Sequence, residues 1–306
     1  MLPLKHYLQK PNLFFVSVLQ KWGGWIPDQI YLRLLFRLKM GYRLDLKNPK
    51  TFSEKLQWLK INDHNGEYTK MVDKYLVKEY VSNVIGEEFV IPNYGMWDRP
   101  SEIEWDLLPD QFVLKTTHGG GSSGVVICKD KNYFDKERAI DILGRSLRQD
   151  IYKTLREWPY KGVQKRIFAE KYLEIKTGDS AIPDYKWYCF SGEPKYCQVI
   201  QNRFTEETID FFDTSWNHLN FSGLSPSSGP LAKSAVAIPE CPEQINTQIK
   251  IARRLSEGMP FARIDLYEIH GQVFFGEITF YPMSGFGIFT PKQYNEMLGQ
   301  ELKLHC

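Results

Sequence analysis

The chain has 306 residues, of which 42% are hydrophobic and 25% are charged. These values are ordinary for a soluble globular protein with one large domain or two to three small ones. No run approaches the length of about twenty apolar residues that spans a bilayer. The five cysteines are odd in number and are never spaced as C-x-x-C. They argue against a zinc site and a disulfide framework, and they predict a reducing cytoplasm.

The net charge of +2 is unevenly distributed. Residues 1–43 carry seven Lys or Arg and a single acid, Asp28, which gives +6 and leaves −4 for the remainder. A basic, aromatic-rich start can favour an anionic membrane face or an anionic polymer. A pair of solvated basic helices packed on the body is the more common explanation. No small-residue cleavage site follows "NLFFVSVL", so we expect no signal peptide.

Helical patterns dominate the first ninety residues. The segment "TFSEKLQWLK" opens with Thr51-x-x-Glu54, a capping-box pattern. Residues 68–86 follow with apolar residues at helical spacing and Gly86 as a stop. Within them Lys74 and Lys78 are four apart, which predicts that both lie on one helical face.

From Glu88 onward the period of the sequence is that of strands, with two helices inserted. Strand patterns occupy residues 88–95, 111–119, 124–130, 166–174, 183–190, 194–204 and 209–213. Helical patterns occupy residues 135–157 and 242–258, and the Ser-, Gly- and Pro-rich residues 222–236 indicate a mobile surface loop. Helices first and then strands in hairpins predict an α+β fold with an antiparallel sheet.

A glycine-rich loop lies between two of the predicted strands. Gly119-x-Gly121-x-x-Gly124 is formally the dinucleotide pattern, but a strand follows it where a Rossmann site needs a helix. A strand, a Gly/Ser turn and a strand can instead form a flap whose backbone N–H groups fold over phosphates, with Lys115 just before it. A plain hairpin with a surface lysine explains this segment equally well.

The stretch "ARIDLYEIHGQVFFGEITF", residues 262–280, predicts two strands around a His270–Gly271 turn. Asp265 and Glu277 are each six positions from Gly271, so they face each other if the turn has three residues and are offset by one if it has two. Like charges across a strand pair are destabilising. A divalent cation between the two carboxylates would remove the repulsion, and a solvent-facing polar surface neutralised by Arg263 is the alternative.

The two strands and their continuation, "FGEITFYPMSG", resemble the Mg-ATP-binding end of the ATP-grasp superfamily, the fold of D-alanine–D-alanine ligase. The whole chain resembles the TupA-like ATP-grasp proteins, which have functions in polysaccharide biosynthesis. The matching segments run in order over about residues 40–300 and include "NPKTFSEKLQWLK", "DKYLVKEYV", "VLKTTHGGGSSG" and "PDYKWYCFSGEP".

The resemblance implies an ATP-grasp α+β fold, with antiparallel sheets, helices and a nucleotide held between two lobes. We expect a helical N-terminal region at residues 1–86, a small lobe with the glycine-rich flap at 87–170, and a C-terminal lobe with the metal and substrate site at 171–306.

The resemblance also implies nucleotide contacts. Lys115 corresponds to the phosphate-binding lysine before the flap, and Lys74 to an earlier nucleotide-binding lysine. The remaining predicted contacts are flap residues and residues of the hinge "AEKYLE": His118, Gly119, Gly120, Gly121, Ser122, Ser123, Glu170, Lys171, Tyr172, Leu173 and Glu174. In the hinge Glu170 would accept a hydrogen bond from the adenine amino group, and the backbone of residues 171–173 would bind the edge of the ring. Glu174 would contact the ribose.

Metal and catalytic residues are implied in the same way. Asp265 and Glu277 correspond to Mg²⁺ ligands, Arg263 to the charge stabiliser beside them, and Lys186 to a basic residue near the transferred phosphate. Thr279 stands where many members have Asn, and its hydroxyl can ligate Mg²⁺ or a bound water, which leaves the number of metal ions open. For the substrate we expect contacts from Arg203, Ser284 and Gly285.

The implied activity is that of an ATP-dependent carboxylate–amine ligase with ATP and Mg²⁺ as cofactors. Its substrates would be an amino acid or amine and a sugar acid, such as a hexuronic acid of a capsule or O-antigen, and no nucleic acid. The expected location is the cytoplasm, with peripheral contact between the basic N-terminal region and the inner membrane. Two alternatives remain open: a glycosyltransferase, for which "IDFFD" has the wrong acid spacing, and a non-catalytic nucleotide-binding protein, which Thr279 permits.

Overall fold

The computed structural model describes residues 11–120, 124–174, 182–203, 205–225 and 231–304. Its α-helices are α2 (Pro11–Trp22), α3 (Asp28–Met40), α4 (Phe52–Asn62), α5 (Tyr68–Val72), α6 (Val77–Ile85), α7 (Lys136–Leu147), α8 (Ile151–Leu155), α9 (Ile245–Leu255) and α10 (Gln293–Glu301). Short 3-10 turns include η1 (Gly23–Trp25), η2 (Glu87–Phe89), η6 (Trp158–Gly162) and η7 (Pro282–Gly285).

The strands form two main sheets and one small one, and every pairing between strands is antiparallel. The four-stranded sheet has the order β1 (Asn93–Trp97), β4 (Ile167–Lys171), β2 (Phe112–Thr116), β3 (Val125–Cys128). The six-stranded sheet has the order β11 (Gln272–Thr279), β10 (Phe261–Ile269), β5 (Asp184–Phe190), β6 (Glu193–Gln201), β7 (Thr208–Asp213), β8 (His218–Leu219). Strands β12 (Ile288–Thr290) and β9 (Ser222–Ser225) form the third sheet. The predicted α+β class with antiparallel sheets is confirmed.

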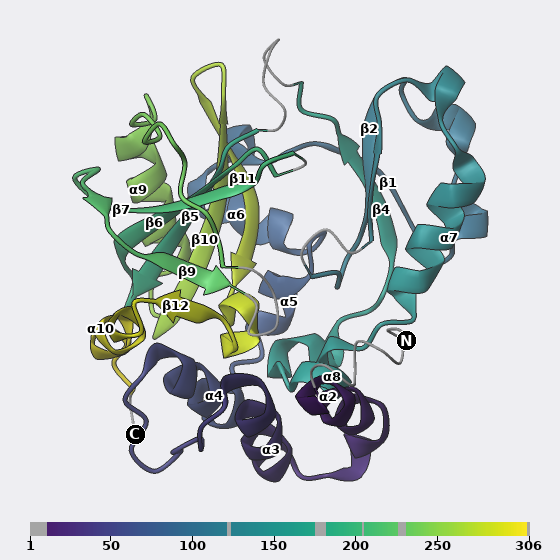
Figure 1. The fold of residues 1–306 in the computed structure, drawn as a ribbon. Coiled ribbons are helices and arrows are strands. Elements are labelled where there is room, and N and C mark those ends of the chain that lie inside the picture. The colour runs from purple at the N-terminus through teal and green to yellow at the C-terminus, as the bar shows by residue number, and fades with distance from the viewer. Residues whose placement is uncertain (1–10, 121–123, 175–181, 204, 226–230, 305–306) are drawn as a thin grey trace.

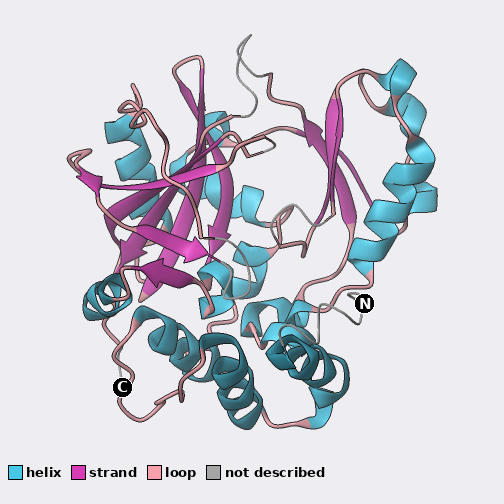
Figure 2. Ribbon diagram, viewed as in Figure 1, coloured by secondary structure: helices cyan, strands magenta, loops and turns pink. Residues whose placement is uncertain are grey.

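The two main sheets stand on opposite sides of the molecule (Figure 1). Helix α7 covers the outer side of the four-stranded sheet, and α9 packs on β5, β6 and β10 of the six-stranded sheet. Helices α2, α3, α4 and α8 lie together below both sheets in the view of Figure 2.

The helix patterns of residues 51–86 are confirmed in part. The Thr51 side chain accepts from the Glu54 N–H and the Glu54 carboxylate accepts from the Thr51 N–H, so the predicted capping box starts α4. The second pattern, at residues 68–86, forms two helices, α5 and α6, with a turn between them. Asp73 Oδ1 holds this turn, because it accepts from the N–H groups two and three residues later. Lys74 lies in this turn and Lys78 lies on α6, so the prediction that they share one helical face is wrong.

Three other predicted segments differ from the structure. Residues 88–95 begin as η2 and become a strand only at Asn93, directly after Pro92. The helix expected at 135–157 is divided into α7 and α8, and the Asp150 side chain caps the second helix. Residues 222–225 of the expected loop form β9, because they pair with β12, and residues 226–230 lie outside the described residues.

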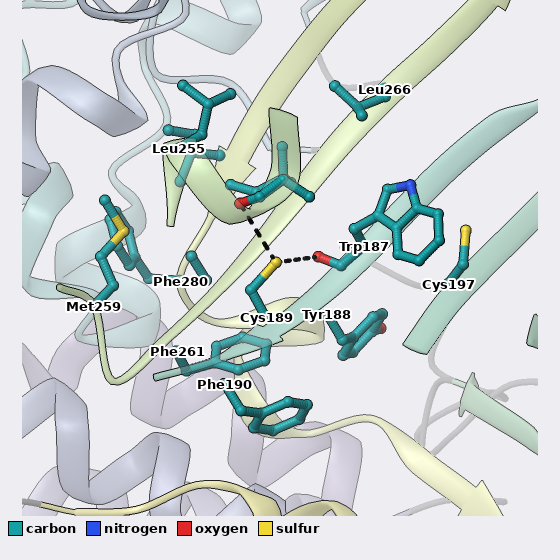
Figure 3. Close-up of a cluster of buried hydrophobic side chains, with 14 of the residues drawn as sticks. Trp187, Tyr188, Cys189, Phe190, Cys197, Leu255, Met259, Phe261, Leu266 and Phe280 are labelled. Atoms are coloured by element: carbon teal, nitrogen blue, oxygen red, sulfur yellow. Dashed lines mark hydrogen bonds between the residues drawn. The ribbon is translucent and has the colours of Figure 1, made fainter. Parts of the chain in front are cut away.

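The main apolar core is formed by side chains of the six-stranded sheet and of the elements that pack on it (Figure 3). Trp187 and Tyr188 are both fully buried, and Phe261 lies among further rings, with centroids 5.0 Å from Phe52 and 5.2 Å from Phe190. Helices α4, α5 and α6 contribute residues to this same core. The division at residues 86 and 170 stays a prediction.

Phe261→Ala should lower the free energy of unfolding by about 3–5 kcal/mol, because it leaves a ring-sized cavity between α4 and the sheet. Urea denaturation measures this value. The matched control is Leu107→Ala, since the Leu107 side chain is 76% exposed, and its effect should stay within about 0.5 kcal/mol. Equal effects of the two substitutions would contradict the assignment of this core.

Candidate active site between the two sheets

The β10–β11 hairpin places Asp265 and Glu277 directly opposite each other. The turn has two residues, His270 and Gly271, both with positive φ (52° and 74°), and it alone would offset the two acids by one position. A β-bulge at Gly276 corrects the offset, because Leu266 pairs with Phe275 whereas the next pair is Asp265 and Glu277. The two carboxylates therefore face each other although the turn has two residues, through a bulge that the turn count did not include.

Arg263 holds the two acids and Thr279 together. Its Nε donates to Asp265 Oδ1 at 2.7 Å, and its Nη2 donates to Asp265 Oδ2 at 2.8 Å. The same Nη2 donates to Glu277 Oε1 at 3.3 Å and to Thr279 Oγ1 at 3.1 Å. The Thr279 hydroxyl in turn donates to Glu277 Oε1 at 3.1 Å. All four predicted residues of the hairpin thus form one connected cluster.

Two lysines from other elements also pair with the acids of this cluster. Lys74, in the turn before α6, is ion-paired with Glu277, and Lys186, on β5, is ion-paired with Asp265. Lys186 also lies 2.8 Å from Asp184 Oδ2, which accepts from Arg203 Nη2 at 2.8 Å. The other oxygen of Asp184 is buried and has no hydrogen-bond partner among the residues that the structure describes. Lys74 and Lys186 therefore contact the predicted metal ligands, and Arg203 is connected to them through Asp184.

The pKa values of the two acids are shifted in opposite directions. Burial raises the pKa of Asp265, and Arg263 and Lys186 offset this only partly. Burial also acts to raise the pKa of Glu277, but Lys74, Lys186 and Arg263 hold it well below its ordinary value. The pKa of Arg263 is raised because Asp265 more than offsets its burial.

A second ionic cluster belongs to the four-stranded sheet. The Glu170 carboxylate on β4 is buried and is ion-paired with Lys115 on β2 and with Lys78 on α6, the latter at 2.7 Å. Lys78 also donates to Ile91 O at 2.8 Å and to Asn93 Oδ1 at 2.5 Å. Burial acts to raise the pKa of Glu170, yet the two lysines keep it below its ordinary value.

A cleft of about 2580 Å³ joins the two clusters. Its lining includes Lys115 and Glu170 from one sheet and Asp265 and Glu277 from the other. Further predicted residues line the same cleft: Lys74, Gly120, Lys171, Tyr172, Leu173, Lys186, Arg203, Arg263, Thr279 and Ser284. The structure therefore brings the lysine before the glycine loop and the acidic hairpin to one place.

The remaining predicted residues have different surroundings. The His118 ring is buried and its Nε2 is 3.1 Å from the carbonyl oxygen of Ser146, and Gly119 N–H donates to the carbonyl of Thr116. Gly285 packs against α4, where a Cβ would lie 2.3 Å from Gln57 Nε2. Glu174 is exposed at the end of the described hinge. Gly121, Ser122 and Ser123 lie outside the described residues.

The sequence did not point to a third group of buried polar residues, below the hairpin. Lys60 on α4 donates to the carbonyl oxygen of Leu155 at 3.0 Å and to both Ser284 oxygens at 2.8 Å. Burial lowers the pKa of Lys60 to about 7 and raises that of the neighbouring Glu157. These contacts hold Ser284, whose φ is +55°, at the wall of the cleft. The only sequence signal is one Lys among the polar positions of a helix.

The donor set of the hairpin suits a hard cation such as Mg²⁺. It offers carboxylate oxygens from Asp265 and Glu277 and the hydroxyl of Thr279 beside them. Among the residues that the structure describes, no group of three or more His, Cys, Asp and Glu side chains is placed to hold a metal. An ion held here would therefore take its other ligands from water and phosphate oxygens, as Mg²⁺ commonly does.

The fold and the cleft are those of an ATP-grasp protein. The model of the family described as TupA-like ATPgrasp matches residues 54–303, and the chain belongs to that family. A comparison with curated protein sequences gives no match.

Solved structures similar to this chain include ATP-grasp ligases. D-alanine–D-alanine ligase from Bacillus anthracis, complexed with ATP, is 16% identical with a TM-score of 0.42, over 76% of this chain and 63% of that chain. The ligase from Helicobacter pylori is 13% identical with a TM-score of 0.39, over 76% and 61% of the two chains. The ATP-grasp ligase PsnB, complexed with Mg and ADP, is 10% identical with a TM-score of 0.39, over 81% and 67%. This chain thus spans under two thirds of the D-alanine–D-alanine ligases.

Glu170→Gln should lower the free energy of unfolding at pH 7 by about 3–5 kcal/mol, because it leaves the buried Lys78 and the half-buried Lys115 without a counter-charge. The wild-type carboxylate has a pKa below its ordinary 4.5, so its stabilisation is present above that pH and is lost as the pH falls through the folded-state pKa. The difference between wild type and variant should therefore shrink below pH 4.5.

Urea denaturation at a series of pH values measures this difference. The control is Glu193→Gln, whose exposed carboxylate pairs with Arg253 at 3.0 Å and should contribute no more than about 1 kcal/mol. A difference between wild type and Glu170→Gln that does not depend on pH would show that the ion pairs are not its source.

Proposed function

We propose that the protein is an ADP-forming carboxylate–amine ligase. The observation that carries this proposal is the single cleft with Lys115 and Glu170 on one side and the Arg263–Asp265–Glu277 cluster on the other. Such a cleft can hold a polyanionic nucleotide between two sheets and has opposed carboxylates for its cation. Membership of the ATP-grasp family supports the same assignment.

The reaction forms an amide in two steps. An oxygen of the substrate carboxylate attacks the γ-phosphorus of ATP, the bond to the β-phosphate oxygen breaks, and ADP leaves. The amine nitrogen then attacks the carbonyl carbon of the acyl phosphate, inorganic phosphate leaves, and the nitrogen loses a proton. The first step is needed because a carboxylate oxygen is a poor leaving group, so the protein mainly positions reactants and offsets charge.

Mg²⁺ would be held by Asp265 and Glu277, with Thr279 beside them, and when bound it offsets the charge of phosphate oxygens. The cationic side chains of the chain would then serve the same phosphates. Lys74 and Lys186, now paired with these acids, would turn to phosphate oxygens, and Arg263 would remain between them. Mg²⁺ would replace the lysines at the acids, and the phosphates would replace the acids at the lysines, so the number of charge pairs would stay constant. This limits the free-energy cost of the exchange in a buried site.

The adenosine end would lie at the hinge. We propose that the backbone of Lys171, Tyr172 and Leu173 reads the adenine ring, since all three line the cleft next to β4. The Glu170 carboxylate accepts from two lysines in the structure. A contact with the adenine amino group would use its remaining acceptor capacity, and Glu174 would reach the ribose. Gly120 would bring backbone close to the phosphates.

The acceptor would be a sugar acid, such as a hexuronic acid of a surface polysaccharide, and the donor of the nitrogen an amino acid or amine. Arg203 supports the choice of a sugar acid as substrate, because its half-buried guanidinium lines the cleft and can bind a carboxylate through two N–H groups. Ser284, held by Lys60 and Gln57, would form the floor of the substrate site, and Gly285 would let the backbone beside it pack against α4. We further propose a cytoplasmic enzyme in peripheral contact with the membrane.

Incubation of the purified chain with Mg-ATP and panels of uronic acids and amino acids tests the ligase assignment. Release of ADP and phosphate only when both substrates are present supports it. Release of UDP from a UDP-sugar would establish a glycosyltransferase in its place, and ATP binding without turnover under all combinations would establish a nucleotide-binding protein.

Glu277→Gln should lower the rate of ADP formation at least about a hundredfold, because it removes one of the two carboxylate charges that would hold Mg²⁺ without changing side-chain size. The rate is measured with a coupled ADP assay, and circular dichroism checks the fold. Glu193→Gln, a matched exchange of an exposed carboxylate at the start of β6, should keep the wild-type rate. A wild-type rate in Glu277→Gln would remove this residue from the metal site.

Lys115→Met should raise the dissociation constant of ATP roughly 10- to 100-fold, since a charge-assisted hydrogen bond to a phosphate is lost. The fold should survive, because Glu170 keeps its pair with Lys78. Isothermal titration calorimetry measures the affinity. Lys195→Met, a lysine change at an exposed position of β6, should bind ATP as the wild type does, and equal affinities of all three proteins would exclude Lys115 from the nucleotide site.

A further inference from the structure

Exposed apolar side chains are concentrated in the first helices. Within the described part of the chain, eight of the eighteen large apolar residues that are exposed fall between Phe14 and Tyr42. They include Trp22, 66% exposed, and Trp25, 84% exposed. Single exposed apolar residues need no explanation, but a contiguous group of this kind marks an interaction surface.

The apolar residues of α2 and α3 share one face. Phe15, Val18 and Trp22 follow one another at intervals of three and four along α2, and Ile30 and Leu34 are four apart on α3. A shallow groove of about 480 Å³ between the two helices is lined by Phe15 and Val18 from one helix and by Leu34 and Arg37 from the other. We call the exposed side of α2, η1 and α3 the N-terminal face.

The same face is strongly basic. Residues 11–43 contain five Lys or Arg, namely Lys21, Arg33, Arg37, Lys39 and Arg43, against a single acid. That acid, Asp28, is ion-paired with Arg156 on the adjoining segment, with Nε and Oδ1 2.9 Å apart, and accepts from the Tyr152 hydroxyl at 2.8 Å. Within residues 11–43 no other acid offsets this positive charge, and Asp45, just beyond them, lies near Arg33.

The N-terminal face borders the cleft of the candidate active site. Gln20 and Lys21, at the end of α2, and Lys39, at the end of α3, contribute to the lining of that cleft. Within the described ranges no helix is long and apolar enough to cross a membrane.

We propose that the N-terminal face docks on an anionic lipid bilayer. The exposed Trp, Phe, Ile and Leu side chains enter the headgroup region, and the Lys and Arg side chains meet the lipid phosphates, as interfacial helices do. A second copy of the chain fits poorly, because a two-fold interface would press two basic faces together. This inference identifies the surface that would make the peripheral membrane contact proposed above, and it does not depend on the ligase reaction.

Sedimentation of the full chain with vesicles tests the proposal. Binding is expected to vesicles of equal parts phosphatidylglycerol and phosphatidylcholine, and not to phosphatidylcholine alone. It should weaken as NaCl is raised from about 0.1 M to 1 M, because the Debye length falls from about 10 Å to 3 Å.

Two double variants separate the charged from the apolar contribution. Arg33→Gln with Arg37→Gln should weaken binding roughly 25-fold, since each basic side chain near an anionic surface strengthens it about fivefold. Trp22→Ser with Trp25→Ser should weaken it more than about tenfold through lost apolar burial. Both variants should bind Mg-ATP like the wild type, so failure of the docking proposal is distinguishable from failure of the ligase proposal.

Matched controls lie on other surfaces. Arg253→Gln with Arg254→Gln removes two neighbouring charges from α9, and Leu107→Ser with Tyr133→Ser removes two side chains that are 76% and 89% exposed. Both controls should bind vesicles like the wild type. Equal binding to neutral vesicles, no binding to either, or unchanged binding by the tryptophan variant would overturn the proposal. So would a dimer in sedimentation velocity that the tryptophan variant abolishes, since the face would then bind a second copy.

Discussion

The repulsion between Asp265 and Glu277 is the constraint around which this site is built. The two carboxylates face each other on paired strands in a largely buried place, where unpaired charges are costly. Arg263 lies between them, and Lys74 and Lys186 arrive from the α5–α6 turn and from β5. The α5–α6 turn and β5 therefore each contribute a cation to the hairpin, and together with Arg263 these cations offset the repulsion between the two acids.

The sequence predicted the parts of the site that depend on local periodicity. Alternation along the strands placed Arg263 and Asp265 on one face, and the glycine-rich loop identified Lys115. The bulge at Gly276 was not predictable in this way, because the residue count around the turn allowed two registers and only the packed sheet selects one.

Contacts between distant elements were the other part that local patterns could not supply. Lys60 and Lys78 occupy positions in helices that are normally solvated, and their partners Ser284 and Glu170 are far away in the chain. The division of residues 68–86 had a weak signal in Asp73, whose side chain competes with the helix for backbone N–H groups. The helical spacing of the apolar residues outweighed that signal. The prediction therefore placed Lys74 on a helix, whereas it lies in the turn between α5 and α6.

Lys74 and Lys78 belong to one short segment, yet they bind carboxylates of different sheets, Glu277 and Glu170. The backbone N–H of Lys74 also donates to the carbonyl of Thr117 beside β2. This segment therefore connects the two sheets at two separate points. Because the two ion pairs use different lysines, loss of one pair leaves the other contact between the sheets in place.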